Sequence, residues 1–108
     1  MEQKVQQHVL TLLGFAQAAG KIASGDDATR IALTRQRGRL LLLAEDAADS
    51  TKKRLMRLSE RMQVPHVVLS ADRDTLGLAI GKSPRAALVV LDAQFAQAIQ
   101  RSLSREEK

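Results

Sequence analysis

The chain of 108 residues contains no cysteine, tryptophan or tyrosine and only two phenylalanines. The absence of cysteine excludes disulfides, thiolate catalysis and cysteine-based zinc or iron–sulfur sites, and it fits a reducing compartment. The scarcity of aromatic rings excludes recognition of bases by stacking on an aromatic sheet. No apolar run is long enough to cross a membrane, and the polar N-terminus is unlike a signal peptide. These features predict a cytoplasmic protein of one domain, residues 1–108, with a folded core at about 3–103.

Positive charge is in excess, with 17 lysines and arginines against 12 acidic residues and a net charge of +5. This balance favours an anionic partner. His8 and His66 lie in unrelated contexts, so no spacing indicates a metal. Asp72 and Asp74 are explained as helix caps and Glu45-Asp46 as a solvated strand end, because no nucleophile accompanies them. The sequence therefore predicts no catalytic residue, no metal and no cofactor.

Helical periodicity alternates with short apolar runs along the whole chain. The runs 40–44, 66–69 and 87–91 are typical of strands buried on both faces, and residues 21–24 fit a small edge strand. Helices are expected over about 3–18, from 26 to the basic segment 35–38, from 49 to about 63, over 72–80, and from 92 to about 103. The alternation predicts a three-layer α/β/α sandwich around a small mixed, largely parallel four-stranded sheet.

Two of the expected helices carry informative side-chain patterns. Ala28, Ile31 and Ala32 are the expected inward stripe of the second helix. The segment 49–51 is expected to cap the third helix through its side chains. The third helix also has a basic stripe on another face, at four-residue spacing: Lys53, Arg57 and Arg61.

Two loops are candidate sites, because sites in open α/β sheets form where loops leave the strand ends. Ser24–Asp27 opens the second helix, whose free N-terminal N–H groups attract anions. Gly81–Arg85 precedes the last strand. The forked guanidinium of arginine suits phosphate, so a phosphate-bearing polymer is the first partner to consider. The basic residues that flank the two loops are Lys21, Arg30, Arg35, Arg37 and Arg39 for the first, and Lys82 and Arg85 for the second.

An ordered series of short motifs resembles the L7Ae/L30e superfamily of ribosomal proteins, and within it the bacterial YlxQ-like branch. The resemblance runs from about Leu12 to Ile99, and no single motif decides it. Its marks are Leu13–Lys21, Ser24-Gly25, Leu40–Asp46, Thr51–Lys53, Val64-Pro65, Leu76–Lys82 and Ala96–Ile99.

The resemblance implies an α/β/α sandwich and RNA binding, typically at kink-turns, which are sharply bent internal loops read by shape and backbone. Family members grip RNA with the start of the second helix and with the loop before the last strand. By position, Gly25, Asp26, Asp27, Ala28 and Ile31 match the first region, and Lys82, Ser83, Pro84, Arg85 and Ala86 match the second. Glu45 and Asp46 sit at the nearby strand end.

The sequence departs from kink-turn binders at three positions. Such proteins usually have Asn or Lys followed by Glu or Gln at Asp27 and Ala28, and a basic residue at Ile31. An exposed Ile31 would favour an alternative, a protein-interaction module on the same fold that has lost kink-turn recognition.

The main prediction is a monomeric, non-catalytic RNA-binding protein, ribosome-associated or acting on structured RNA. The predicted RNA-binding residues are Lys21, Gly25, Asp26, Asp27, Arg30, Glu45, Lys82, Ser83, Pro84 and Arg85.

Overall fold

The computed structural model describes the backbone of residues 2–106 and the side chains of residues 7–104. Over this range five helices alternate with four strands, in the order the periodicity predicts. The elements are α1 (Glu2–Ala18), β1 (Ile22–Ser24), α2 (Asp26–Thr34), β2 (Leu40–Leu43), α3 (Asp49–Arg61), β3 (His66–Val68), α4 (Arg73–Ala79), β4 (Ala87–Val90) and α5 (Ala93–Glu106).

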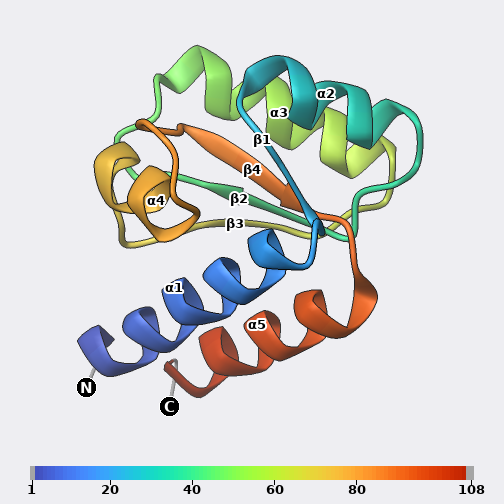
Figure 1. Ribbon diagram of the computed structural model, residues 1–108. Coiled ribbons are helices and arrows are strands. Elements are labelled where there is room, and N and C mark those ends of the chain that lie inside the picture. Colours follow the sequence, from blue (N-terminus) through green and yellow to red (C-terminus); the bar gives the residue numbers. More distant parts are fainter. Residues whose placement is uncertain (1, 107–108) are drawn as a thin grey trace.

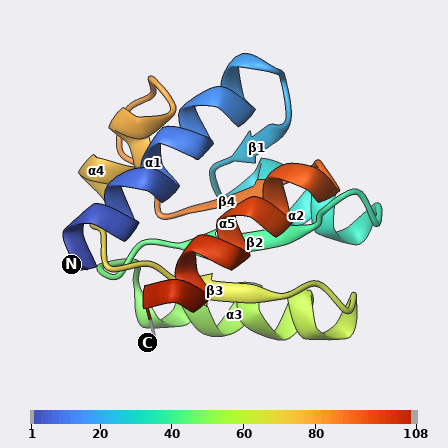
Figure 2. The same ribbon diagram turned by 90° about the horizontal axis from the view of Figure 1, so that it is seen from below.

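The helices cover both faces of the sheet and complete the predicted three-layer sandwich (Figure 1). On one face α1 and α5 lie side by side, with α4 beside α1 at the end of the strands (Figure 2). On the other face lie α2 and α3. Successive side chains of a strand point to opposite faces, so β2 serves both cores. Leu40 and Leu42 pack with α1, α4 and α5, whereas Leu41 and Leu43 pack with α2 and α3.

The sheet is mixed, with strand order β1-β4-β2-β3. Only β2 and β3 pair in parallel, while β4 runs antiparallel to both β1 and β2. The expectation of a largely parallel sheet is therefore wrong. A parallel connection must carry the chain back to the opposite end of the sheet, whereas the segment 69–86, which contains α4, stays at the end where β3 finishes. β4 therefore enters the sheet there and runs antiparallel to β2.

Strand burial follows from this order. β2 is central and completely buried, as its continuous apolar run predicts. β3 is an edge strand, and Val68 is 39% exposed, so the prediction that this strand is buried on both faces is wrong. β1 lies at the opposite edge, where the sequence places a small edge strand.

Helix starts were predicted with mixed success. Asp72 caps α4 by accepting a hydrogen bond from the Thr75 N–H at 2.8 Å, and Asp92 accepts one from the Phe95 N–H at 2.9 Å. The side-chain cap expected at 49–51 is wrong, because Ala48 is the N-cap and Asp49 is already helical.

The inner face of α2 also differs from the expected stripe. Thr29, Ala32 and Leu33 are the buried residues, whereas Ala28 and Ile31 are exposed. Both sets have the spacing i, i+3, i+4, so periodicity alone does not choose between them. Leu33 packs in the core beneath the helix, which leaves Ile31 on the outer side.

Candidate nucleic-acid interface

One end of the sheet brings the two candidate loops together. β1, β2 and β3 all end there, and β4 begins there. The Gly25 N–H donates to the Ala87 carbonyl at 3.0 Å, and the Ala44 N–H donates to the Ala86 carbonyl at 2.8 Å. We call this surface the rim and define it as residues 24–27, 45–46 and 82–86.

The start of α2 lies open at the rim. Gly25 is its N-cap, with φ of 93°, a left-handed value that glycine adopts without steric cost. No side chain caps the helix, and its first internal bond runs from the Thr29 N–H to the Gly25 carbonyl. The N–H groups of residues 26–28 therefore have no partner within the helix. A side chain at Gly25 would meet nothing within 4 Å, so this end is accessible to a ligand backbone.

Arg85 holds the second loop against the first. Its Nε donates to Ser24 Oγ at 3.2 Å, which ties the loop to the end of β1. Its Nη1 donates to the Ser83 carbonyl at 3.0 Å, to Ser83 Oγ at 2.7 Å and to the Pro84 carbonyl at 3.3 Å. The partly buried Arg85 is thus a positioning residue of the rim.

The loop also rests directly on α4. The Lys82 N–H donates to the Gly77 carbonyl at 2.8 Å. A Cβ at Gly77 would overlap the backbone of Ser83, so glycine is required for this close approach. Lys82 itself is exposed at the outer side of the loop.

The acidic residues at the start of α2 are paired with arginines. Asp26 accepts two hydrogen bonds from Arg54 of α3, at 2.8 and 2.9 Å. The bonded Arg54 guanidinium lowers the pKa of Asp26 below its usual value, against a smaller opposing effect of burial. Asp27 is 91% exposed and lies 3.8 Å from Arg30. Asp26 therefore ties α2 to α3 with both of its carboxylate oxygens already bonded.

The acidic end of β2 is similarly occupied. Asp46 Oδ1 accepts a hydrogen bond from the Arg73 N–H at 2.9 Å, and Oδ2 lies 3.6 Å from Arg73 Nε. Lys52 Nζ donates to the Glu45 carbonyl at 2.7 Å, while the Glu45 side chain is exposed. The rim thus combines open backbone donors with charges that are largely paired.

Two predicted site residues lie outside the rim. Arg30 lies beside it on α2, 3.8 Å from Asp27, whereas Lys21 lies away from it. Lys21 lies at the opposite end of β1, where the Leu91 N–H donates to its carbonyl at 2.8 Å. There it lines a hollow of about 270 Å³ together with Gly20, Gln36, Arg37, Arg39 and Leu91. The sequence grouped Lys21 with Arg30, but the fold places them at different ends of the sheet.

The sequence analysis missed three contacts that support the rim: Arg54 on Asp26, the close approach of Gly77 to Ser83, and the Ser24 hydroxyl that accepts from Arg85. Gly77 left a detectable sign, since an isolated glycine inside a helix often marks close packing. Arg54 left none, because its partner Asp26 is 28 residues away.

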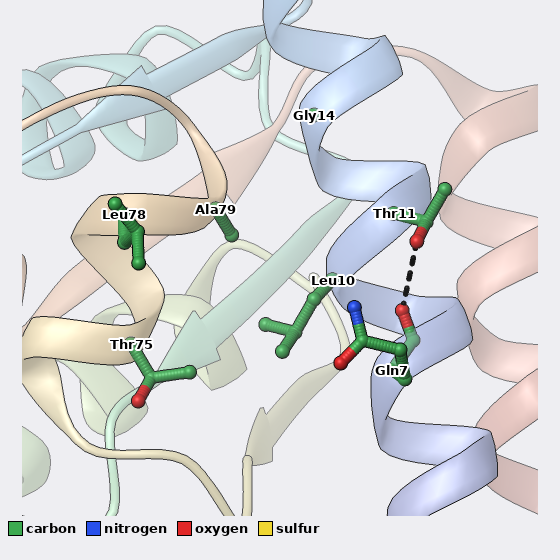
Figure 3. Close-up of a pocket in the computed structure, with 7 residues that line it drawn as sticks. All are labelled: Gln7, Leu10, Thr11, Gly14, Thr75, Leu78 and Ala79. Carbon is green, nitrogen blue, oxygen red and sulfur yellow. Dashed lines mark hydrogen bonds between the residues drawn. The ribbon is translucent and has the colours of Figure 1, made fainter.

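An uncharged groove lies between α1 and α4 and has a volume of about 380 Å³ (Figure 3). Leu10 points into it from α1, and Thr75 and Leu78 flank it from α4. Leu78 is 79% exposed, and Phe15, which follows the groove residue Gly14, is 62% exposed.

The two histidines lie apart from the rim. His66 Nδ1 is 3.1 Å from Ser59 Oγ, and His8 is exposed on α1. Across the described residues no group of three or more His, Asp or Glu side chains is placed to hold a metal ion. None of the helices described is long and apolar enough to cross a membrane.

Two curated proteins are similar to this chain along most of their length. The "RNA-binding protein YlxQ" of Bacillus subtilis (strain 168) is 36% identical over 85 residues, which cover 79% of this chain and 84% of the relative. The protein of the same name from Enterococcus faecium is 29% identical over 97 residues, which cover 90% and 92%.

Solved structures share the fold. A protein described as having unknown function from Bacillus halodurans superposes with a TM-score of 0.84 and 32% identity, covering 89% of this chain and 96% of that one. The 15.5kD RNA binding protein of Giardia lamblia has a TM-score of 0.76 at 19% identity, covering 96% and 88%. At that identity the second likeness shows the fold alone.

A family model described as "Ribosomal protein L7Ae/L30e/S12e/Gadd45 family" matches residues 7–100. Together with the curated relatives it indicates a non-enzymatic protein, as the sequence predicts. The chain belongs to this L7Ae/L30e/S12e/Gadd45 family, and within it to the YlxQ-like branch.

Proposed function

We propose that this protein is a non-catalytic RNA-binding protein that contacts RNA with the rim. The observation that carries the proposal is the joining of the two loops by the Gly25–Ala87 and Arg85–Ser24 hydrogen bonds. The two curated relatives, both named RNA-binding proteins, support it. We further propose that the chain acts as a single domain and a monomer in the cytoplasm.

The rim offers two kinds of contact to RNA. The N–H groups of residues 26–28 and the positive end of the α2 dipole suit a phosphate. Lys82 adds an exposed positive charge from the neighbouring loop. Because these groups recognise backbone rather than base edges, they give affinity and orientation without sequence specificity.

We propose structured RNA with a kink-turn-like bend, ribosomal RNA included, as the target. Backbone hydrogen bonds hold the two loops to one end of the sheet, and a surface fixed in this way suits recognition of RNA by its shape. Asp27 and Ala28 replace the residues that kink-turn binders usually present, so base contacts at this helix are expected to be few. Backbone and shape therefore supply most of the recognition.

The proposal is tested by measuring binding to a kink-turn RNA and to an unbent duplex of equal length, each across a salt series. Preference for the kink-turn supports shape recognition, while equal and steeply salt-dependent binding would leave only a general RNA binder. Lys82→Gln is expected to flatten the slope of log K against log salt by about 0.7–0.9, one phosphate contact. Lys53→Gln, the same change on an exposed face of α3, is the control. Absence of RNA binding in the wild-type protein at moderate salt would overturn the proposal.

A protein partner is the second candidate, because Ile31 is 39% exposed on the face of α2 that it shares with Asp27. Apolar patches rimmed by polar residues mark protein contacts, and Ile31 would be the apolar member of such a patch. A partner retained on the immobilised protein after nuclease treatment, and lost in Ile31→Lys, would support this function. Loss of the partner on nuclease treatment would favour RNA as the link.

A further inference from the structure

The end of the sheet opposite the rim presents a concentrated positive surface. Lys21, Arg35, Arg37 and Arg39 are all exposed there, around the ends of α2 and α3. We call these four residues, together with Gln36 and Gln63, the basic edge. Two adjoining hollows of about 270 and 310 Å³ lie on it and share Gln36 and Arg39 in their lining.

Among the described side chains, no carboxylate forms an ion pair with a cation of the basic edge. The ion pairs formed by the described side chains join Asp26, Asp27 and Asp46 to other arginines, at the rim. Asp92, next to Leu91 in the chain, is engaged in capping α5.

Helix dipoles do not account for this charge either. Basic residues at helix C-termini are commonly explained by the dipole, which amounts to about half a negative charge per helix. The ends of α2 and α3 together offset about one of the four positive charges. The remainder is available to an anionic ligand.

Two glutamines at the basic edge adopt a conformation that usually belongs to glycine. Gln36 and Gln63 both have φ of 60°. Each follows a helix whose last turn is closed by a backbone hydrogen bond between residues five apart in the sequence. These bonds run from the Arg37 N–H to the Ala32 carbonyl at 2.9 Å and from the Val64 N–H to the Ser59 carbonyl at 2.8 Å. Left-handed backbone at a residue other than glycine is costly and clusters at functional sites. Here it places two amide side chains in the lining of the hollows.

We propose that the basic edge is a second RNA-backbone-binding surface, so that one protein holds two segments of a folded RNA. Guanidinium groups bind phosphate in two-pronged fashion, and amides suit the ribose hydroxyls between phosphates. Lys21 precedes β1 and Gly25 follows it, so the two surfaces lie at opposite ends of the strands and are placed to contact different segments of a folded RNA. This inference rests on the proposed function in taking RNA as the ligand.

The test compares two triple variants that remove the same charge. Lys21→Gln/Arg37→Gln/Arg39→Gln alters the basic edge, and Lys53→Gln/Arg57→Gln/Arg101→Gln alters exposed sites on α3 and α5. Both are titrated with a kink-turn RNA carrying a long helical arm, over a salt series. The edge variant is expected to flatten the salt slope by about 2.1–2.7, at 0.7–0.9 for each of three phosphate contacts, and to weaken binding at low salt at least tenfold. Equal effects of the two variants would overturn the inference.

The outcomes separate this inference from the proposed function. If the wild-type protein binds RNA and Lys82→Gln weakens it while the edge variant does not, only the second surface is refuted. If the wild-type protein binds no RNA, both proposals fail. If the triple variant does not fold, two other measurements test the second surface. One is RNA binding by Arg37→Gln alone, and the other is the NMR signals of the Gln36 and Gln63 side-chain amides in the wild-type protein. RNA shifts those signals if the surface is used, and unchanged signals at saturating RNA would overturn it.

Discussion

The two ends of the sheet differ in how their charges are used. At the rim, Asp26 and Asp46 bind arginines from α3 and α4, so charge there fixes the positions of helices. At the basic edge, exposed cations surround two hollows. The rim is therefore built by internal contacts and the basic edge by surface charge. A net charge read from composition does not reveal this difference, because it counts paired and free cations alike.

The difference has a consequence for mutations. A change to a paired residue of the rim, such as Asp26 or Asp46, disturbs contacts that hold the fold together, so stability and RNA binding should fall together. A change at the basic edge removes charge that holds little else, so binding should fall while stability is kept. The predictions below test that separation.

Gly77→Ala should have the largest effect. The added Cβ overlaps the backbone of Ser83, so the rim loop must move and strain the Arg85 contacts. Helix propensity favours alanine by about 1 kcal/mol, but overpacking against backbone costs about 1–3 kcal/mol, and we expect a net loss of up to about 2 kcal/mol in the free energy of unfolding. Urea denaturation measures it. Gly14→Ala, also helical but with only the Ala79 carbonyl oxygen nearby at 3.2 Å, is the control. Equal stability of the two variants would show that the loop yields freely.

Gln36→Gly and Gln63→Gly should act in the opposite sense. Glycine relieves the left-handed backbone at both helix ends, and we expect each change to raise the free energy of unfolding by about 0.5–1 kcal/mol. If the amides contact RNA, affinity should fall at the same time. Gln97→Gly, within α5, should instead destabilise by about 1 kcal/mol. A lower free energy of unfolding for Gln36→Gly or Gln63→Gly would mean that the glutamine side chain itself stabilises the fold. The left-handed backbone would then need no explanation by a ligand.

Ile31→Lys should strengthen RNA binding at the rim. The side chain shares a face of α2 with Asp27 and Ala28, and lysine there restores the basic residue usual in kink-turn binders. One more phosphate contact steepens the salt slope by about 0.7–0.9. Leu78→Lys, an equal change on the exposed side of α4, is the control and should have a smaller effect. An equal gain in both variants would indicate that only net charge matters.

Much of the fold could be predicted from the sequence. The run 40–44 is continuous and apolar because β2 is central, and Asp72 and Asp92 lie where caps are needed. The failures concern long-range pairing. β3 has the same apolar composition as a buried strand, and its place at the edge depends on where α4 returns the chain to the sheet. Local patterns contain no information on that return.

The candidate site was predicted less completely than the fold. The two loops were identified correctly as neighbours of strand ends, because strand ends are local features, and the structure joins them. Lys21 was grouped with the wrong loop, because β1 carries the chain from one end of the sheet to the other. Asp26 was expected to face RNA, but a partner in another helix occupies it. Charge pairing across helices is a tertiary property that spacing does not contain.

Arg54→Gln tests that pairing and should have the smallest effect on stability. The hydrogen-bonded Arg54 lowers the pKa of Asp26, so the pair stabilises the fold above the pKa of an unfolded aspartate, about 3.9, and this contribution is lost as the pH falls through the lowered value. Both side chains are about half exposed, which limits the loss at neutral pH to about 0.5 kcal/mol.

The variant should raise the Asp26 pKa toward its usual value and flatten the acid dependence of stability below about pH 4. NMR titration of the carboxyl carbon measures the first effect, and urea denaturation at several pH values measures the second. Arg57→Gln removes the same charge from the same helix without touching Asp26 and should leave that pKa near the wild-type value. RNA affinity distinguishes the two further, because an unpaired Asp26 carboxylate at the rim repels phosphate. If both variants weaken RNA binding equally, the Arg54–Asp26 pair holds α2 against α3 but does not increase the affinity of the rim for an anionic ligand.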